Sequence, residues 1–283
     1  MVQPKIAIIG GSGLYEMEGL KVLEEKEVNT PFGNPSDHFV VGELEGCPVV
    51  FLARHARGHK ILPGEINFRA NIWAIKSLGC QFVLSVSAVG SLKEEIQPGD
   101  LVMVDQFIDR TQGRASTFFG EGIVAHVPFA DPVCDATRVK LVEAGRACGA
   151  TVHEKGTYVC IEGPMFSSRA ESHLFRTWGA DVIGMTNYQE AKLVREAQMS
   201  YATMALSTDY DCWHPDHDSV TAEMVIQTLT QNVELAQTVL KKVVPMINKE
   251  EKSPYAGSLK NAVVTNKLLI PDSTKKKLGV IFE

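Results

Sequence analysis

The stretch Lys5-Ile6-Ala7-Ile8-Ile9, which stops at Gly10-Gly11-Ser12-Gly13, decides the fold of this chain. Its apolar, largely β-branched residues are continuous, so the strand they predict would be buried on both faces. Such a strand belongs in the middle of a sheet that helices cover on both sides. The stretch therefore predicts an α/β fold with three layers, α/β/α.

Similar apolar runs recur along the chain, with amphipathic patterns between them. The alternation predicts a central mixed sheet. The runs predict further strands at Phe39–Val41, Val49–Leu52, Phe82–Val86, Leu101–Val104, Tyr158–Ile161 and Ala202–Leu206. The amphipathic patterns predict helices at Ile66–Leu78, Arg138–Cys148, Ala170–Trp178 and Glu190–Ala197.

A long helix is predicted from Ser219–Glu223 to about Val244, and Pro245 is expected to end it. The segment 248–283 is more polar and holds Lys275-Lys276-Lys277, a pattern typical of a solvated tail. No linker-like stretch or repeat divides the chain, so residues 1–283 are interpreted as one domain.

The composition excludes several classes of function. A net charge of −6 argues against a nucleic-acid surface, and a small anion would need a local positive pocket. The six cysteines form no CxxC pair, and the first residues lead straight into a strand pattern without a signal peptide. No apolar run reaches the ~20 residues of a membrane span. We expect a cytoplasmic protein with no membrane or nucleic-acid partner.

The glycine-rich loop at Gly10–Gly13 fits either a tight turn or an anion-binding nest, to which the Ser12 hydroxyl would add a donor. It is not the dinucleotide fingerprint, because Glu16 stands where GxGxxG needs its third glycine. It is not a Walker A loop either, since no Lys-Ser/Thr pair follows.

Two further strand ends carry polar groups, and strand ends are where open α/β sheets bind ligands. In Ala53–His59, Arg54 could hold phosphate bidentately and His55 could donate from one ring nitrogen, unless the stretch is a solvated basic loop. No carboxylate or thiol lies at metal-ligand spacing there, so we expect no metal. The small and hydroxyl residues of Ser85–Ser91 could line a pocket.

The stretch Ile161–Glu171 combines a Gly-Pro turn with Phe166, an aromatic face for a base or sugar. Ser168 and Glu171 form a capping-box pattern, which leaves Ser167 as the serine for a ligand. A nucleophilic serine is disfavoured because GxSxG is absent. In Ser207–Trp213, Asp209 and Asp211 follow an apolar strand and precede a tryptophan, which favours partial burial and a raised pKa for one of them.

Together these stretches resemble the trimeric purine nucleoside phosphorylase family, and within it the methylthioadenosine phosphorylase branch, from about Lys5 to Pro271. The resemblance is carried by Trp73-Ala74, Glu94–Asp100, Asp105–Thr111, Phe175–Ile183 and Thr208–Trp213. It implies a nucleoside phosphorylase-like fold, a homotrimer with sites at subunit interfaces, and no cofactor beyond inorganic phosphate as co-substrate. It also implies a role in purine and methionine salvage.

The resemblance further implies a role for each matching residue. Phosphate would be held by Ser12, Arg54, His55, Ser87 and Thr186. The nucleoside would contact Ala88, Phe166, Met185, Asp209 and Asp211, with His126 and Leu269 reaching a neighbouring subunit's site near the 5′ group. The sequence departs from the family at Met165, where arginine is usual, and at Asn187–Glu190, where proline normally precedes the glutamate.

In the implied reaction phosphate attacks C1′ while a donor at N7 stabilises the departing purine. Asp209 is the candidate general acid. A protonated Asp209 would donate to N7 of adenine and accept from N6, whereas 6-oxopurine members of the family tend to carry asparagine there. The face formed by Ala222, Val225 and Ile226 fits either an apolar wall for a methylthio group or ordinary core.

The sequence thus favours phosphorolysis of 5′-methylthioadenosine to adenine and 5-methylthioribose 1-phosphate. The nearest alternative is a phosphorylase for adenosine, inosine or guanosine, and Asp209 disfavours the 6-oxopurines. A hydrolytic nucleosidase is disfavoured by Arg54, His55 and the glycine loop, and a nicotinamide-dependent oxidoreductase by the broken fingerprint. A catalytically inactive binding protein of the same fold is also compatible with Met165 and Gln189.

Overall fold

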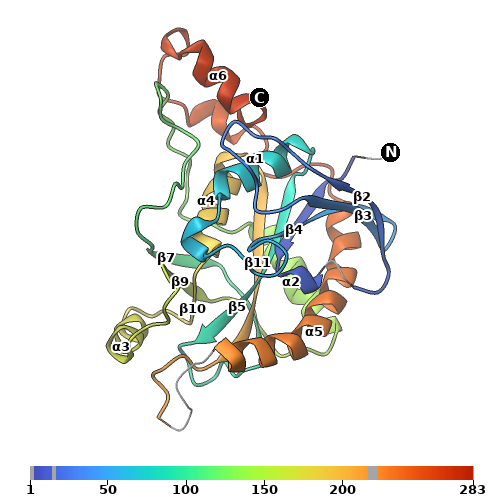
Figure 1. The fold of residues 1–283 in the computed structure, drawn as a ribbon, viewed down its shortest axis with the longest axis vertical. Helices are drawn as coiled ribbons and strands as arrows, with labels where there is room; N and C mark the ends of the chain where they lie inside the picture. The colour runs from blue at the N-terminus through green and yellow to red at the C-terminus, as the bar shows by residue number, and fades with distance from the viewer. Residues whose placement is uncertain (1–2, 15–16, 216–221, 283) are drawn as a thin grey trace.

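The computed structural model describes residues 3–14, 17–215 and 222–282, and only the backbone of Ser12 and of residues 222–231. Within these residues the chain forms one mixed sheet with helices against it (Figure 1). This confirms the predicted α/β class. Among the described residues, no helix is both long and apolar enough to cross a membrane.

Eleven strands make up the sheet, and β5 lies at its centre. The main path runs β2-β3-β4-β1-β5-β10-β9-β7, and β11, β6 and β8 continue from the other edge of β5. The strands are β1 Ile6–Gly10, β2 Leu20–Lys26, β3 Phe39–Leu44, β4 Cys47–Ala53, β5 Phe82–Ser91, β6 Leu101–Met103, β7 Gln106–Arg110, β8 Val152–His153, β9 Thr157–Ile161, β10 Val182–Gly184 and β11 Ser200–Asp209.

The helices α1 and α4 pack against each other, as do α2 and α5, and the two pairs lie to either side of β11 in Figure 1. Every residue of β1 is buried, as the opening sequence predicts. The helices are α1 Phe68–Ser77, α2 Asp135–Ala147, α3 Arg169–Thr177, α4 Asn187–Glu196, α5 Ala222–Asn248 and α6 Asp272–Leu278, with short 3-10 turns η1 Ser12–Leu14, η2 Pro63–Glu65, η3 Ser258–Asn261, η4 Lys267–Leu269 and η5 Gly279–Ile281.

The seven predicted strands are confirmed. The sequence patterns did not predict where these strands end, and they missed four further strands. β5 and β11 each continue three or more residues beyond the apolar run, because β5 and β11 pair with each other from Phe82 and Ser200 onward to Gly90 and Asp209. β2 is largely exposed, and β8 and β10 have only two and three residues, so none shows a clear apolar pattern. No strand was predicted at β7, whose residues were noted only within Asp105–Thr111, one of the stretches that carry the family resemblance.

The expectation that Pro245 ends the long helix is wrong. Pro245 lies inside α5, which continues to Asn248. Val243, Val244 and Ile247 around it are completely buried. Their packing outweighs the cost of an internal proline, about 3 kcal/mol.

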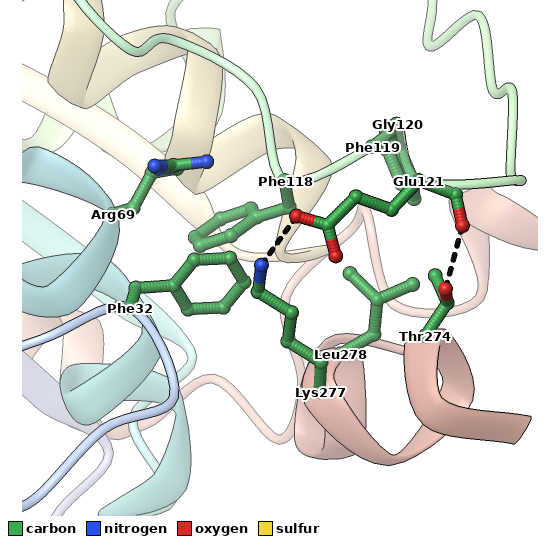
Figure 2. Close-up of a pocket in the computed structure, with 9 residues that line it drawn as sticks. All are labelled: Phe32, Arg69, Phe118, Phe119, Gly120, Glu121, Thr274, Lys277 and Leu278. Carbon is green, nitrogen blue, oxygen red and sulfur yellow. Dashed lines mark hydrogen bonds and ion pairs between the residues drawn. The ribbon is translucent and has the colours of Figure 1, made fainter.

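The expectation of a solvated C-terminal tail is also wrong. Leu278 and Ile281 are buried, and the Trp73 indole N–H donates to the Leu278 carbonyl over 3.0 Å. Figure 2 shows the α6 side chains closing a pocket with Phe32 and Phe118, where Lys277 Nζ lies 2.6 Å from Glu121 Oε1. The lysine run is thus part of a short helix that packs on the body of the protein.

Candidate active site

The candidate site lies at the carboxyl ends of four parallel strands, β1, β4, β5 and β11. β1 runs parallel to β4 and β5, and β5 runs parallel to β11. The chain after β4 stays close to β1, because the Arg54 N–H donates to the Gly10 carbonyl over 2.9 Å. The polar stretches that follow these strands in the sequence are thereby brought together.

One edge of β5 is left open at this point. β1 pairs with residues 82–85 of β5, and β10 arrives from the opposite direction to pair with Gly90 and Ser91. The residues between, 86–89, have no strand partner on that edge, although β11 covers the other edge throughout. Ser87 and Ala88 therefore line a gap between the end of β1 and the end of β10.

Arg54 is buried at this gap and forms an ion pair with Glu190 of α4. Its Nε lies 2.5 Å from Glu190 Oε1, and both side chains are at most 3% exposed. Burial lowers the pKa of Arg54, but the charge of Glu190 and its hydrogen bond outweigh this and raise the pKa above its ordinary value. The guanidinium is therefore charged at any physiological pH.

The protein itself uses most of the Arg54 donors. Besides Glu190, Nη2 donates to Ser85 Oγ over 2.6 Å, and Nη1 donates to the Val86 carbonyl over 3.1 Å. Of the five N–H groups of an arginine, one on Nη1 has no partner among the described residues. Bidentate phosphate binding by Arg54 stays a prediction, since in this conformation the residue has one N–H to offer.

Sequence reasoning missed the network behind Arg54. Glu190 Oε2 accepts from Ser85 Oγ over 2.8 Å and from Tyr201 OH over 3.0 Å. The Asn187 amide lies 2.7 Å from Thr203 Oγ1 and 2.9 Å from Ser85 Oγ. The only signal for Glu190 was an acidic residue in the first turn of a predicted helix, which does not distinguish a buried carboxylate from an exposed one.

His55 is held differently from the expectation. Its Nδ1 lies 2.8 Å from the Ile61 carbonyl, and a carbonyl only accepts, so this contact assigns the proton to Nδ1. Burial lowers the pKa of His55 to about 4, and the charges of Arg54 and Arg114 act in the same direction. The neutral ring donates to Ile61 and leaves Nε2 as an acceptor. In this form His55 suits a protonated phosphate oxygen, and the expected donation from a ring nitrogen to phosphate stays a prediction.

Several predicted ligand groups are buried without a partner. Ser87 Oγ, Ser167 Oγ and Asp211 Oδ2 have no hydrogen-bond partner among the described residues. Buried polar atoms are normally satisfied, so an orphan of this kind calls for an explanation such as a ligand. Ser168, in contrast, forms the predicted capping box with Glu171 at the start of α3, which confirms its structural role.

Asp209 ends β11 beside Gly90 of β5. It accepts from Thr208 Oγ1 and from the Asp211 N–H, each over 2.7 Å. Burial nevertheless raises its pKa, and burial raises the pKa of Asp211 to about 6. A Cβ at Gly90 would lie 2.9 Å from Asp209 Oδ1, so only glycine permits this close approach. The predicted partial burial of both carboxylates is confirmed.

Met185 and Thr186 follow β10 and enter the gap from the side opposite to β1. Thr186 is buried and forms the N-cap of α4, whose N-terminal dipole favours an anion. Phe166 lies on the turn after β9 and is 44% exposed, and Met165 beside it is 82% exposed. The departure at Met165 therefore places an apolar side chain in solvent and not in the buried part of the site.

The remaining predicted residues are not joined to this cluster by contacts of the described side chains. Leu269 lies just before α6, at the end of the molecule opposite to the carboxyl end of β5 (Figure 1). His126 belongs to the same region, because its N–H donates to the Ala262 carbonyl over 2.8 Å. Ser12 begins η1, and Ala222, Val225 and Ile226 lie in the first turns of α5, but their side chains are outside the described part of the chain.

Comparisons with known proteins agree with this architecture. A family model described as the phosphorylase superfamily matches residues 5–245. S-methyl-5′-thioadenosine phosphorylase of Geobacter sulfurreducens is 54% identical over 98% of this chain and 97% of that protein. The protein of the same name from Thermosynechococcus vestitus is 56% identical over 98% of this chain and 97% of its own length.

Solved structures show the same similarity. A methylthioadenosine phosphorylase from an antarctic soil metagenomic library superposes with a TM-score of 0.94 at 49% identity, covering 99% of both chains. Methylthioadenosine phosphorylase from Schistosoma mansoni in complex with adenine gives a TM-score of 0.88 at 37% identity, covering 92% of this chain and 99% of that chain.

The buried ion pair leads to a stability prediction. We expect Glu190→Gln to lower the free energy of unfolding by about 3–5 kcal/mol, because Arg54 would remain buried without a compensating charge. Asp272→Asn, which removes the exposed partner of Lys275, should cost at most about 1 kcal/mol. Urea unfolding measures both, and a Glu190→Gln variant as stable as the wild type would contradict the role of the pair.

The raised pKa of Asp211 leads to a pH prediction. Its folded value of about 6 lies above the ordinary 3.8, so the folded state holds the proton more tightly than the unfolded state. Ionisation therefore costs stability as the pH rises from about 4 to about 6, by up to about 3 kcal/mol. We expect Asp211→Asn to gain stability relative to the wild type over this interval in pH-dependent urea unfolding. The Asp272→Asn control should show no such trend, and an Asp211→Asn difference equal at both ends of the interval would refute the assignment.

Proposed function

This chain belongs to the phosphorylase superfamily, and we propose that its candidate site carries out the phosphorolysis of 5′-methylthioadenosine. The reaction releases adenine and 5-methylthioribose 1-phosphate. Relatives that share more than half of their residues with this chain over nearly its whole length carry the name S-methyl-5′-thioadenosine phosphorylase. The chain is accordingly a pentosyltransferase.

One observation carries the assignment of the site: a cationic side chain and an acidic side chain lie near the two ends of residues 86–89 of β5, the stretch that neither β1 nor β10 pairs with. At Val86 β5 contacts Arg54, and at Gly90 it contacts Asp209. Four residues of strand span about 13 Å, which leaves room for a phosphate at one end and a purine at the other. Ser87 and Ala88 lie between, where the ribosyl carbon would meet phosphate.

At the cationic end we propose a phosphate site formed by Ser12, Arg54, His55, Ser87 and Thr186. Arg54 offers an Nη1–H and Ser87 a hydroxyl, neither of which has a partner among the described residues, and α4 offers its N-terminus. His55 Nε2 accepts from the P–OH of a protonated phosphate. Phosphate held here is the nucleophile, and its charge stabilises the oxocarbenium character that develops on the sugar.

At the acidic end Asp209 is the proposed general acid. The purine that covers the carboxyl excludes water, which further favours its protonated form. Protonated Asp209 donates to N7 as negative charge builds on the leaving base, and its other oxygen accepts from N6 of adenine. Asp211 supports this arrangement through the N–H that it donates to Asp209.

Between these ends, Ala88, Phe166, Ser167 and Met185 are proposed to contact the sugar and base. Ala222, Val225 and Ile226 of α5 are proposed to face the 5′-methylthio group. No metal or organic cofactor is proposed. A cytoplasmic location, with the products returned to purine and methionine salvage, fits a chain whose six cysteines are all free.

A homotrimer is proposed because His126 and Leu269 lie far from the carboxyl ends of the strands in their own chain. Their region exposes a set of apolar side chains, a feature of subunit contacts. Leu268 is 91% exposed and Leu269 73% exposed. The strand-like pairing of Ala125 with Val263 holds His126 and this apolar surface together. A second copy of the chain would bring both to the 5′ end of a neighbouring site.

Base release tests the proposed reaction and its base preference. We expect adenine to be released from 5′-methylthioadenosine only when phosphate is present, with little hypoxanthine from inosine. Asp209→Asn should lower kcat/KM for 5′-methylthioadenosine by about 10²–10⁴-fold and shift the ratio of the two activities towards inosine. Release without phosphate would indicate a nucleosidase, and preferential cleavage of inosine would contradict the role of Asp209.

Subunit complementation tests the trimer. Light scattering should give the mass of three chains, and His126→Ala and Asp209→Asn should each lose activity. When the two variants are co-expressed, random mixing should restore both intact residues at about a quarter of the sites. A monomeric mass, or activity no higher than the mean of the two separate variants, would refute a cross-subunit role for His126.

A further inference from the structure

Arg114 is a further arginine with a buried side chain, and neither the sequence patterns nor the family resemblance drew attention to it. It follows β7 in a stretch without regular structure, yet its side chain is only 3% exposed. A charged side chain is rarely buried so completely unless its charge and its donors are matched.

All five N–H groups of Arg114 are used within the protein. Nε donates to Glu162 Oε2 over 3.0 Å, which also neutralises the charge. Nη1 donates to the Met185 carbonyl over 2.6 Å and to Gln189 Oε1 over 3.1 Å. Nη2 donates to the carbonyls of Glu162, over 2.6 Å, and Ile161, over 3.5 Å. With no donor left, Arg114 cannot bind an anionic substrate itself.

Its partners belong to the two segments that carry the proposed sugar contacts. Ile161 ends β9, and Glu162 leads into the turn before Phe166 and Ser167. Met185 directly follows β10. The two segments also touch, because a Cβ at Gly163 would lie 2.5 Å from Met185 Sδ. A single planar guanidinium thus joins the Phe166 turn to the Met185 backbone.

Gln189 holds Arg114 in this orientation. Gln189 is completely buried, and its Nε2 donates to Thr111 Oγ1 over 2.8 Å while Oε1 accepts from Arg114. Thr111 in turn donates to Asp109 Oδ1 over 2.6 Å. The glutamine therefore connects Arg114 to the end of β7. A side chain without an acceptor at this position would leave this contact of the guanidinium unmade.

We propose that Arg114, held by Gln189, is a positioning residue for the nucleoside. Its hydrogen bonds to Glu162 and Ile161 on one side and to Met185 on the other, here called the clamp, set the distance between the Met185 backbone and the Phe166 turn. The proposal rests on the proposed function, since it is the nucleoside that both segments contact there.

Three of the proposed phosphate contacts, Arg54, His55 and Ser87, are not among the hydrogen-bond partners of Arg114, although Thr186 directly follows its partner Met185. Losing the clamp should weaken binding of the nucleoside and leave binding of phosphate almost unchanged.

The charge and the geometry of Arg114 are separable. Its positive charge lowers the pKa of His55, so the field of Arg114 reaches the phosphate end. Arg114→Lys keeps this charge but replaces a planar fork of five donors by three donors on one atom. It leaves some of the carbonyls of Met185, Glu162 and Ile161 without a partner. A purely electrostatic role would survive this substitution, whereas a positioning role would not.

The test compares Arg114→Lys, Gln189→Leu and a control with the wild type. Arg110→Lys is the control, because Arg110 is an exposed arginine at the end of β7 that faces the Trp178 ring at 5.7 Å. The Kd for 5′-methylthioadenosine is measured by equilibrium dialysis without phosphate, where phosphorolysis cannot proceed. KM is measured separately for the nucleoside and for phosphate.

We expect Arg114→Lys to raise the nucleoside Kd and KM by about 10-fold or more, because bonds from a charged donor to buried carbonyls are lost. The KM for phosphate should stay within about twofold of the wild type, since the charge is kept. Gln189→Leu, which leaves the carbonyl contacts in place, should raise the nucleoside Kd by a smaller factor, and Arg110→Lys should change nothing.

Unchanged nucleoside binding in Arg114→Lys, or an equal rise in both KM values, would overturn the positioning role. If Arg114→Lys does not fold, unchanged nucleoside binding in Gln189→Leu overturns the role of Gln189 and with it the proposed clamp. A wild-type chain that binds 5′-methylthioadenosine but does not cleave it would refute the proposed function alone, because the Kd comparison still tests the clamp.

Discussion

The buried ion pair between Arg54 and Glu190 is the interaction on which the rest of the site depends. It joins the residue after β4 to the first turn of α4, and Ser85 of β5 bonds to both partners. Two charges withdrawn from water cost free energy unless their geometry and remaining hydrogen bonds are nearly complete. The Glu190 carboxylate meets that condition through Tyr201 and Ser85. The pair therefore fixes where α4 starts, and with it the position of Thr186.

Arg54 and Arg114 illustrate how the same side chain serves different purposes. Among the described residues one N–H of Arg54 has no partner, whereas every donor of Arg114 bonds within the protein. The first arrangement leaves a cation able to meet a ligand. The second uses a cation as a rigid connector between backbone segments, since a guanidinium presents its donors in one plane. Burial alone does not distinguish these two roles of an arginine. The number of its N–H groups that bond within the protein does.

Much of the fold and part of the site were predictable from the sequence. The all-buried β1 and the seven apolar runs indicated the α/β sheet, and the capping box at Ser168 was recognisable because its two residues are three apart. β10 was not predictable, because three residues carry too little pattern, and its placement depends on pairing with Gly90 and Ser91. Pro245 and the C-terminal lysines were misjudged because local propensity was overridden by packing, of Ile247 in one case and of Leu278 in the other.

The sequence by itself determined that β1 is an inner strand and which polar groups follow the predicted strands, because burial and strand ends leave local patterns. Only the tertiary structure decided what those groups do. The gap at 86–89 exists because β1 stops and β10 arrives from the opposite direction. His55 presents Nε2 as an acceptor because its Nδ1–H donates to the Ile61 carbonyl, and most of the Arg54 donors bond to Glu190, Ser85 and Val86. Glu190 is 136 residues from Arg54 in the chain, and no local pattern encodes a contact between residues so far apart.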